Sequence, residues 1–163
     1  MPRTVVVDFN TFIAAPVQTV RSQFADIQHH IDANVHPRLH FELLAQEPQR
    51  ARYRQEVTLL GMRQRDLIDR RIDEDGSIHD ESIDGFNKGA KLDYRFAPAA
   101  DSGTPGTRVD IRIMLPTPPF LGFLAPLLKK QVLKEVTEAA QQDKMDIEGG
   151  YRPSSVRPEF AQA

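Results

Sequence analysis

Cysteine and tryptophan are both absent from this chain of 163 residues. Without cysteine, disulfide bonds, thiolate metal sites and cysteine nucleophiles are excluded. Aromatic residues are scarce at 7%, and neither sign of charge dominates, because 21 Lys and Arg residues accompany 23 Asp and Glu residues. The resulting net charge of −2 provides no basic field that would bind nucleic acid or an anionic membrane.

Long hydrophobic runs are also missing. The N-terminus lacks the apolar run of about 7–15 residues that a signal peptide requires. No window approaches the ~18 consecutive apolar residues of a membrane-spanning helix. The longest apolar patch, Pro116–Leu128, contains four prolines and one glycine. We therefore expect a cytoplasmic protein without stable membrane insertion.

The length favours one domain, since domains usually span roughly 100–200 residues. A chain of this size buries about 68–70% of its extended surface, so one hydrophobic core suffices without covalent staples. The segment Gly149–Ala163 mixes glycine, proline and serine with scattered charge. We predict a domain over residues 1–149 and a flexible C-terminal tail over residues 150–163.

The beginning of the chain changes from an alternating to a helical pattern. Residues Thr4–Ile13 are rich in β-branched and aromatic side chains that alternate along the chain, which predicts a strand. Apolar residues between Val17 and Ile27 then recur at helical spacing. A second short helix is predicted from His29, and Pro37 limits it.

About six consecutive strands are predicted between Leu39 and Ile113, followed by a long helix that ends near Ile147, where Gly149 stops it. Strands grouped together and helices set apart indicate an α+β fold with an antiparallel sheet. Only the final helix is long enough to cover the apolar face of that sheet. A curved sheet that grips one helix tends to leave a cavity between them.

Three segments carry a resemblance to a known superfamily: Ile13–Val20, Phe24–Ile27 and Leu127–Leu133. With the order of elements, they resemble the START-like helix-grip proteins, also called SRPBCC, which include polyketide cyclase/dehydrase-like proteins. The resemblance extends to Gly149 and implies a curved antiparallel sheet of about six or seven strands. That sheet wraps around a long C-terminal helix, with two short helices after the first strand. His36 stands where many relatives place a tryptophan.

The resemblance implies a deep apolar cavity for lipids, quinones, sterols or polyketides. Our first hypothesis is a noncatalytic protein that binds a hydrophobic small molecule of the lipid, quinone or polyketide type. The alternatives are a cyclase, aromatase or dehydratase that uses the same cavity, and a module that modulates a protein partner. Whether the chain is an enzyme stays open, with the balance toward a noncatalytic role, and no cofactor is predicted.

Strand parity and helical spacing predict which residues line the cavity. The predicted ligand-binding residues are Gln55, Val57, Leu59, Tyr94, Phe96, Ile111, Ile113, Phe120, Leu124, Leu127, Leu128 and Gln131. No residue is predicted to be catalytic. Parity leaves open whether five polar residues point inward or outward, namely His36, His40, Asp66, His79 and Glu81.

A metal site is not predicted from the histidines. Zinc favours imidazoles that are four residues apart on a helix or held in a close cluster. His36 and His40 have this spacing, but Pro37 lies between them. The neighbours His29 and His30 fit a solvated helix end, where their charge suits the helix dipole.

An apolar lip is predicted at the cavity mouth over Pro116–Leu124, with side chains from Leu115, Phe120, Leu121 and Phe123. Such a lip is either a packed gate or a surface for association. A homodimer or a protein partner is therefore an open possibility.

Overall fold

The computed structural model describes residues 3–117 and 119–156. In chain order, the elements of this part are β1 (Arg3–Ile13), α1 (Val17–Ala25), α2 (Ile27–Asp32), β2 (His40–Gln46), β3 (Arg50–Leu59), β4 (Met62–Ile72), β5 (Ile78–Gly85), β6 (Lys91–Asp101), β7 (Thr104–Thr117), the 3₁₀ helix η1 (Pro119–Leu124) and α3 (Ala125–Glu148).

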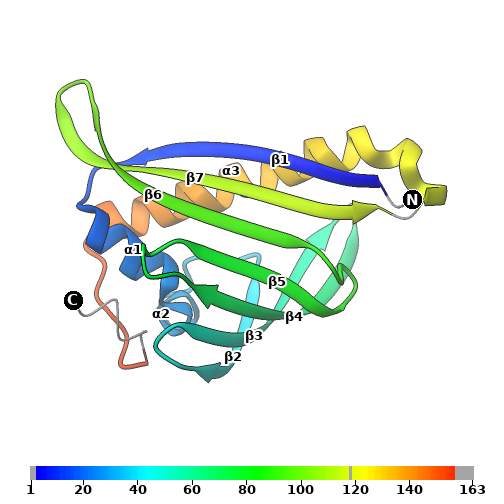
Figure 1. The fold of residues 1–163 in the computed structure, drawn as a ribbon, viewed down its shortest axis with the longest axis horizontal. Helices are drawn as coiled ribbons and strands as arrows, with labels where there is room; N and C mark the ends of the chain where they lie inside the picture. Colours follow the sequence, from blue (N-terminus) through cyan, green and yellow to red (C-terminus); the bar gives the residue numbers. More distant parts are fainter. Residues whose placement is uncertain (1–2, 118, 157–163) are drawn as a thin grey trace.

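Within the described part, the seven strands form one antiparallel sheet in the order β1-β7-β6-β5-β4-β3-β2. Figure 1 shows this sheet curving in front of α3, with α1 and α2 at one end of it. The predicted α+β helix-grip architecture is confirmed, including the two short helices after the first strand.

Strand β1 shows why one face of the sheet is apolar. Side chains alternate along a strand, so the buried residues Val5 and Val7 point inward while Asp8, which follows Val7, points outward. On the outer face, Asp8 forms an ion pair with Arg112 of β7, with Oδ1 and Nε 3.2 Å apart. Burying the inward set against α3 fixes the register, because a slip of one residue would reverse every side chain.

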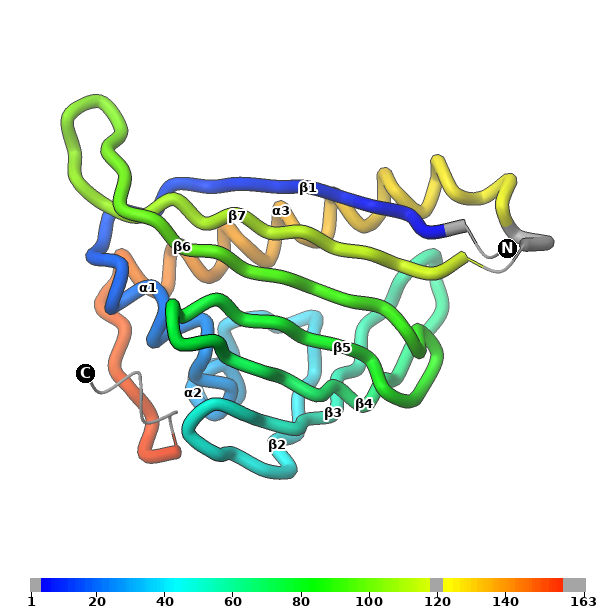
Figure 2. Tube along the Cα trace, viewed as in Figure 1, coloured from blue at the N-terminus to red at the C-terminus, as the bar shows by residue number. Residues whose placement is uncertain are grey.

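The end of helix α3 is tied to the corner between β1 and α1. The Gly149 amide caps the helix by donating to the Met145 carbonyl at 2.9 Å. Lys144 Nζ donates to the Phe12 carbonyl at 2.7 Å, and Glu148 accepts from the Ala14 amide at 3.0 Å. Figure 2 shows the end of α3 (orange) beside the turn between β1 and α1 (blue). These contacts fasten the C-terminal end of α3 to this corner of the fold.

Two clusters of the hydrophobic core lie against opposite ends of α3, and a third packs Ile27 of α2 against Tyr53 and Ile68 of the sheet. At the C-terminal end, Phe24 and Val20 of α1 pack with Ala140 and the sheet residues Ile78 and Ile111. At the other end, a second cluster centres on five buried residues, Val5, Val7, Leu59, Leu115 and Val132.

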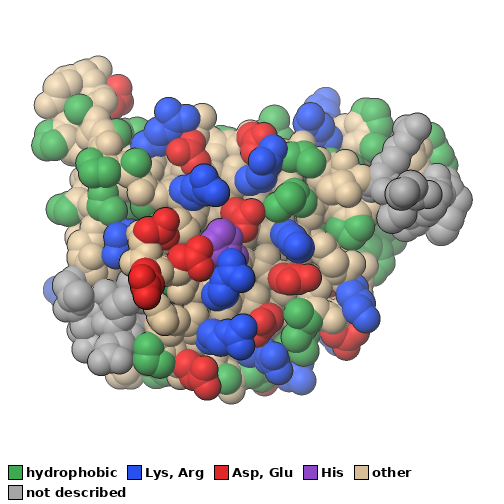
Figure 3. All heavy atoms as spheres, viewed as in Figure 1, with side chains coloured by type: hydrophobic (Ala, Val, Ile, Leu, Met, Phe, Trp, Pro, Cys, Tyr) green, Lys and Arg blue, Asp and Glu red, His purple; other side chains and the backbone are tan. Residues whose placement is uncertain are grey.

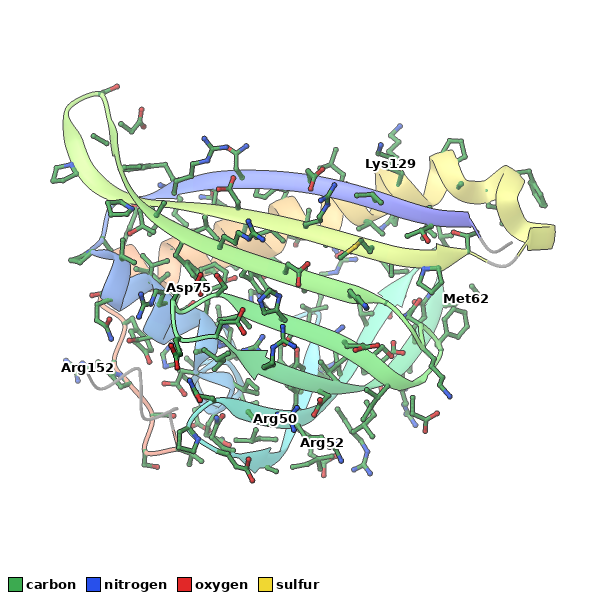
Figure 4. All side chains as sticks on the ribbon, in the orientation of Figure 1. Arg50, Arg52, Met62, Asp75, Lys129 and Arg152 are labelled. Carbon is green, nitrogen blue, oxygen red and sulfur yellow. The ribbon has the colours of Figure 1, made fainter. Side chains whose placement is uncertain are left out.

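Charges of both signs cover the outer face of the sheet, as Figure 3 shows. Many form ion pairs between neighbouring strands, such as Arg52 with Asp69 at 3.4 Å and Arg65 with Glu56 at 2.7 Å. Figure 4 labels Arg50 and Arg52, which are exposed on β3. The arginines of this face are therefore solvated and largely paired with acids.

Residues 151–156 of the predicted tail contact the domain. Tyr151 donates its hydroxyl hydrogen to Asp26 at 2.6 Å, and the Ser154 amide donates to the same carboxylate at 2.8 Å. The division of the chain at residue 149 stays a prediction, and residues 157–163 lie outside the described part. Across residues 3–117 and 119–156, no helix combines the length and apolar character needed to cross a membrane.

Candidate ligand-binding cavity

A cavity of about 240 Å³ lies between the inner face of the sheet and α3. Exposed Arg38 and Lys91 take part in its lining, so the cavity reaches the surface. Its apolar wall comes from the sheet and from α3, and includes Val57, Leu59, Leu92, Ile111, Ile113, Leu115, Val132 and Val136. A helix gripped by a curved sheet thus leaves the hollow that its sequence pattern predicts.

Half of the predicted ligand-binding residues line this cavity, namely Gln55, Val57, Leu59, Tyr94, Ile111 and Ile113. They come from β3, β6 and β7. Each lies on a strand whose alternation is unambiguous, so parity placed its side chain correctly on the inner face. Whether these residues bind a ligand stays a prediction.

Two predicted residues, Phe96 and Leu124, do not line the cavity. Phe96 on β6 contacts the Phe24 ring edge-on, with centroids 5.5 Å apart, and belongs to the core under α1. Leu124 is the last residue of η1 and is not among the described cavity-lining residues. The side chain of Phe120 lies outside the described residues.

The predicted helix residues sit too close to the N-terminal end of α3. Leu127 is 52% exposed, Leu128 packs beside the cluster of β1, and Gln131 donates to Glu135 at 3.0 Å. The side chains of α3 that do line the cavity begin at the following residue and end five residues before the helix ends at Glu148: Val132, Glu135, Val136, Glu138, Ala139, Ala140, Gln142 and Asp143. The predicted helix was therefore correct, but its cavity-facing part is shifted along the axis.

The first polar group in the cavity wall joins Arg70, Asp80 and Tyr53. Arg70 donates to both carboxylate oxygens of Asp80 at 2.7 Å, and Tyr53 donates to the same carboxylate at 3.1 Å. The remaining Arg70 nitrogen, Nη1, donates to the Phe24 carbonyl at 2.9 Å. This buried, bidentate ion pair between Arg70 and Asp80 fixes both side chains, and through the Phe24 carbonyl it connects β4 and β5 to the end of α1.

Burial and Asp80 together control ionisation in this group. Burial lowers the pKa of Arg70, but the adjacent Asp80 carboxylate outweighs it, so the guanidinium stays charged. Burial and the negative charge of Asp80 raise the pKa values of Tyr53 and Tyr94 well above the ordinary tyrosine value. Both phenols therefore remain neutral. The Tyr94 hydroxyl makes no hydrogen bond to any described residue.

A second polar group surrounds Asp66, a buried carboxylate on β4. Ser82 donates to it at 2.8 Å, and Asn87 donates through its backbone amide at 2.7 Å and its side chain at 2.8 Å. The chain reaches this position through Gly85, where φ is +118° and a Cβ would lie 2.3 Å from the Arg65 carbonyl oxygen. The tight backbone approach thus brings the donors onto Asp66.

The third polar group, which we call the inner cluster, consists of His30, His36 and Asp143. His30 lies on α2, His36 follows in the connection to β2, and Asp143 lies on α3. Both imidazoles direct Nε2 at the same atom, Asp143 Oδ1, which is 3.0 Å from His30 and 3.3 Å from His36. The two rings stack with their centroids 5.2 Å apart. All three residues line the cavity.

Ionisation within the inner cluster follows from the competition between burial and hydrogen bonding. Burial raises the pKa of Asp143, but hydrogen bonds from His30 and His36 outweigh it and hold that pKa well below its ordinary value. Burial lowers the pKa of His36, but the hydrogen bond and charge of Asp143 reverse the shift and raise it. His29 and His30 lie in the last turn of α2, as predicted, but the prediction that they are solvated is wrong. Their side chains are only 12% and 9% exposed and pair with Asp146 and Asp143.

The structure also places the five polar residues whose direction parity left open. His36 and Asp66 line the cavity, whereas His40, His79 and Glu81 are not among its described lining residues. His79 belongs to what we call the outer cluster, formed with Asp73 and Asp93 on the outer face of the sheet. Its Nδ1 lies 2.6 Å from Asp93 and its Nε2 lies 2.8 Å from Asp73.

Sequence reasoning missed Arg70 and Asp80 because charged residues are usually outside. A signal was present: Arg70 alternates in phase with Ile68 and Ile72, and Asp80 in phase with Ile78. All of these residues are buried. A charged residue in phase with the apolar set of a strand therefore marks the polar part of this cavity.

Comparison with known proteins places the fold. No protein-family model and no curated protein matches the chain. A crystal structure of a Thermus thermophilus protein superposes with a TM-score of 0.79 at 22% identity, covering 90% of this chain and 99% of that one. A START superfamily protein of Mycobacterium smegmatis gives 0.72 at 16% identity, covering 88% and 97%. The Zhui aromatase/cyclase of a Streptomyces species gives 0.70 at 14%, covering 91% and 100%.

These likenesses agree with the architecture derived above. The chain has the START-like helix-grip fold that is also found in polyketide aromatase/cyclases. At these identities the comparison establishes the fold, and the chemistry of the cavity must be argued from its own residues.

Proposed function

We propose that this protein binds one compact, mostly apolar small molecule in the cavity between α3 and the sheet. The observation that carries the proposal is a cavity whose walls are apolar but which also presents polar groups from several elements. Burial of apolar ligand surface supplies affinity at about 25 cal/mol per Å², and the polar groups orient the molecule.

The size of the cavity limits the ligand. At about 240 Å³, it lies just below the range of roughly 300–1,000 Å³ that is typical for drug-sized molecules. A molecule with one or two rings, or a short acyl chain, suits this space better than a complete two-chain lipid. This supports the smaller quinone-like and polyketide-like candidates among those implied by the fold.

Tyr94 and Gln55 are the polar groups most available to such a ligand. Both line the cavity, and neither side chain makes a hydrogen bond to a described residue. By contrast, the carboxylates of Asp66 and Asp80 already accept several hydrogen bonds. A ligand carbonyl or hydroxyl can therefore pair with the Tyr94 hydroxyl without disrupting an existing contact.

The first test is titration of the purified protein with N-phenyl-naphthylamine, an uncharged fluorophore with an apolar body. We expect saturable binding at one site. In Val136→Phe the larger side chain occupies part of the cavity and should weaken binding by about tenfold or more, which corresponds to ~1.4 kcal/mol of lost ligand contact. Leu133→Phe is the matched control, because Leu133 lies on the same helix but is 43% exposed.

The outcome that contradicts the proposal is equally specific. If Val136→Phe melts at the temperature of the wild type and still binds the fluorophore as tightly, the molecule does not enter this cavity. Native mass spectrometry of protein purified without detergent, followed by organic extraction, then identifies the natural ligand class from any discrete added mass.

A cyclase, aromatase or dehydratase activity is a second candidate. One observation favours it: the cavity contains an imidazole–carboxylate pair and a neutral phenol, groups that can transfer or donate protons. Incubation with a poly-β-ketone analogue separates the two functions. Recovery of a product that has lost one water indicates catalysis, whereas recovery of the unchanged compound in complex indicates binding alone.

Association with a partner also stays a prediction. Of the proposed apolar lip, Leu115 is buried and lines the cavity, whereas Phe123 is 77% exposed. The side chains of Phe120 and Leu121 lie outside the described residues. Sedimentation of the wild type and Phe123→Ser tests whether this exposed ring supports a dimer.

A further inference from the structure

The inner cluster combines three groups that commonly bind divalent metal ions. His30, His36 and Asp143 each contribute one ligand atom, and these atoms all lie within 4.8 Å of one another. The three residues come from separate parts of the fold: the short helix α2, the connection after it, and the long helix α3. The fold therefore converges two imidazoles and one carboxylate on one point in the wall of the cavity.

The second nitrogen of each imidazole is already fixed. His30 Nδ1 lies 2.8 Å from the Asp26 carbonyl oxygen, which can only accept a hydrogen bond. His36 Nδ1 lies 2.8 Å from Gln142 Oε1, also an acceptor. Both Nδ1 atoms therefore carry the hydrogen. This is how proteins orient metal-binding histidines, because it leaves the Nε2 lone pair free to bind the ion.

The remaining arrangement requires a positive charge at its centre. With hydrogen on Nδ1, two neutral imidazoles would aim their Nε2 lone pairs at a carboxylate oxygen at 3.0 and 3.3 Å. Such contacts are repulsive unless a proton or a cation lies between the atoms. A hydrogen on each Nε2 supplies this charge in the hydrogen bonds to Asp143 described above, whereas one metal ion can replace both hydrogens and bind all three ligand atoms together.

The two histidine–aspartate distances fit a transition metal ion, and the two imidazole nitrogens lie within 4.8 Å of each other. Zinc binds imidazole nitrogen and carboxylate oxygen at about 2.0–2.2 Å, so two ligand atoms separated by bond angles near 90–109° lie roughly 2.9–3.5 Å apart. The observed separations of 3.0 and 3.3 Å fall within this range. Hard ions such as Mg²⁺ and Ca²⁺ prefer all-oxygen sites. The two imidazoles therefore select a borderline ion of the Zn²⁺ type.

We propose that His30, His36 and Asp143 form a mononuclear binding site for a divalent transition metal ion of the Zn²⁺ type, with its open coordination position facing the cavity. Gln142 and the Asp26 carbonyl act as positioning groups that hold the two imidazoles. The open position is available to water or to an oxygen atom of the bound molecule. The inference does not depend on the proposed function, because metal binding is measured in the absence of any organic ligand.

The experiment is calorimetric titration of Zn²⁺ into tag-free, full-length protein that has been treated with chelator and dialysed. We expect one ion per chain. Asp143→Asn and His36→Gln, which preserve approximate side-chain shape, should each weaken binding by about 100-fold or more. Gln142→Leu should weaken it by roughly 10–100-fold, as expected for a group that orients a ligand. Circular dichroism and a melting curve confirm that each variant is folded.

His79→Gln supplies the matched control, because His79 also contacts two aspartates but from opposite sides of its ring. Its affinity for Zn²⁺ should equal that of the wild type. Replacement of Zn²⁺ by Co²⁺ gives a second readout: visible absorption of the bound ion in the wild type that disappears in Asp143→Asn.

Two results overturn the proposal. One is a wild-type protein that binds no stoichiometric Zn²⁺ after chelator treatment. The other is a pair of folded variants, Asp143→Asn and His36→Gln, that bind Zn²⁺ as tightly as the wild type, which would place the ion elsewhere. Binding of the naphthylamine fluorophore, measured on the same metal-free samples, reports separately on the proposed ligand function.

Discussion

The protein brings histidine and aspartate together in two places that differ in geometry and in surroundings. In the inner cluster, two imidazoles converge on one oxygen of Asp143, and the His30 and Asp143 side chains are 9% and 7% exposed. In the outer cluster, one imidazole lies between two carboxylates, with His79 at 24% exposure and Asp73 at 41%. The same side-chain types thus form two different geometries: two imidazoles around one carboxylate, and two carboxylates around one imidazole.

The difference shows that composition alone does not define a site. The two nitrogens of His79 point in opposite directions across its ring, so Asp73 and Asp93 cannot share one ion with it. The outer cluster also lies among many solvated ion pairs on the sheet, where such contacts contribute little to stability. In the inner cluster the ligand atoms converge on one point, the side chains are largely buried, and all three residues line the cavity. Burial and convergence therefore distinguish a chemical site from a solvated ion pair.

The largest expected contrast is the cost of removing one carboxylate from each cluster in metal-free protein. Asp143→Ala leaves His30, His36 and Gln23 without their shared acceptor, so we expect a loss of about 3–5 kcal/mol in the free energy of unfolding. Asp93→Ala removes a partly solvated partner of His79 and should cost less than about 1 kcal/mol. Urea unfolding measures both. Similar losses in the two variants would show that the inner cluster is not effectively buried.

A smaller contrast concerns the imidazoles. His36→Ala leaves Gln142 Oε1 and Asp143 each with one hydrogen bond fewer inside the protein, which should cost about 1–3 kcal/mol. His79→Ala is expected to change stability by no more than about 0.5 kcal/mol, as is usual for surface positions. The same urea experiment compares the two, and a larger loss in His79→Ala would reverse our assignment of inner and outer environments.

The strands of the cavity could be predicted because their periodicity carries direction. On β3, the residues Gln55, Val57 and Leu59 alternate with polar neighbours, and only one face of the sheet can be buried. Because side chains alternate with a period of two, one residue known to point inward fixes the direction of every other residue on the strand. This is why the predicted strand residues, with the exception of Phe96, line the cavity.

Helix α3 shows what periodicity does not contain. Spacing identifies an apolar stripe that includes Val132, Val136 and Ala140. It does not show which part of that stripe faces the cavity and which part packs against the sheet. The predicted contacts at Leu127 and Leu128 therefore lie too near its start. Asp143 continues the same stripe, and an acid in that position is the signal that could have marked a buried polar group.

The inner cluster itself could not be predicted, because its members are distant in sequence. His30 and Asp143 are separated by 113 residues, and His36 and Gln142 by 106. Their meeting depends on the angle at which α3 crosses the short helices. That angle results from packing of the whole core around Phe24 and Ala140, so no local pattern specifies it.

The pH dependence of stability should distinguish the outer cluster further. Burial lowers the pKa of His79, but hydrogen bonds to Asp93 and Asp73 outweigh it, so the pKa in the folded protein lies above the ordinary value of 6.5. A raised pKa means that the folded state binds the proton more tightly than the unfolded state. The stabilisation is therefore complete below pH 6.5 and is lost as the pH rises through the raised value.

The measurement is the difference in unfolding free energy between the wild type and His79→Ala at a series of pH values. We expect this difference to be largest in mildly acidic solution and to shrink as the pH becomes alkaline. A difference that grows with pH would mean that His79 is stabilised in its neutral form, contrary to its position between two carboxylates.

The smallest expected effect is that of salt, and it tests solvent access directly. Raising the ionic strength from 0.1 to 1 M shortens the screening length from about 10 Å to about 3 Å. The cost of Asp93→Ala should therefore fall toward zero in 1 M salt, whereas the cost of Asp143→Ala should stay constant, because mobile ions do not reach a buried pair. Urea unfolding at the two salt concentrations measures both values. If the cost of Asp143→Ala also falls with salt, ions from solution reach the inner cluster through the cavity. The three side chains of the cluster would then be accessible to solvent rather than shielded by the fold.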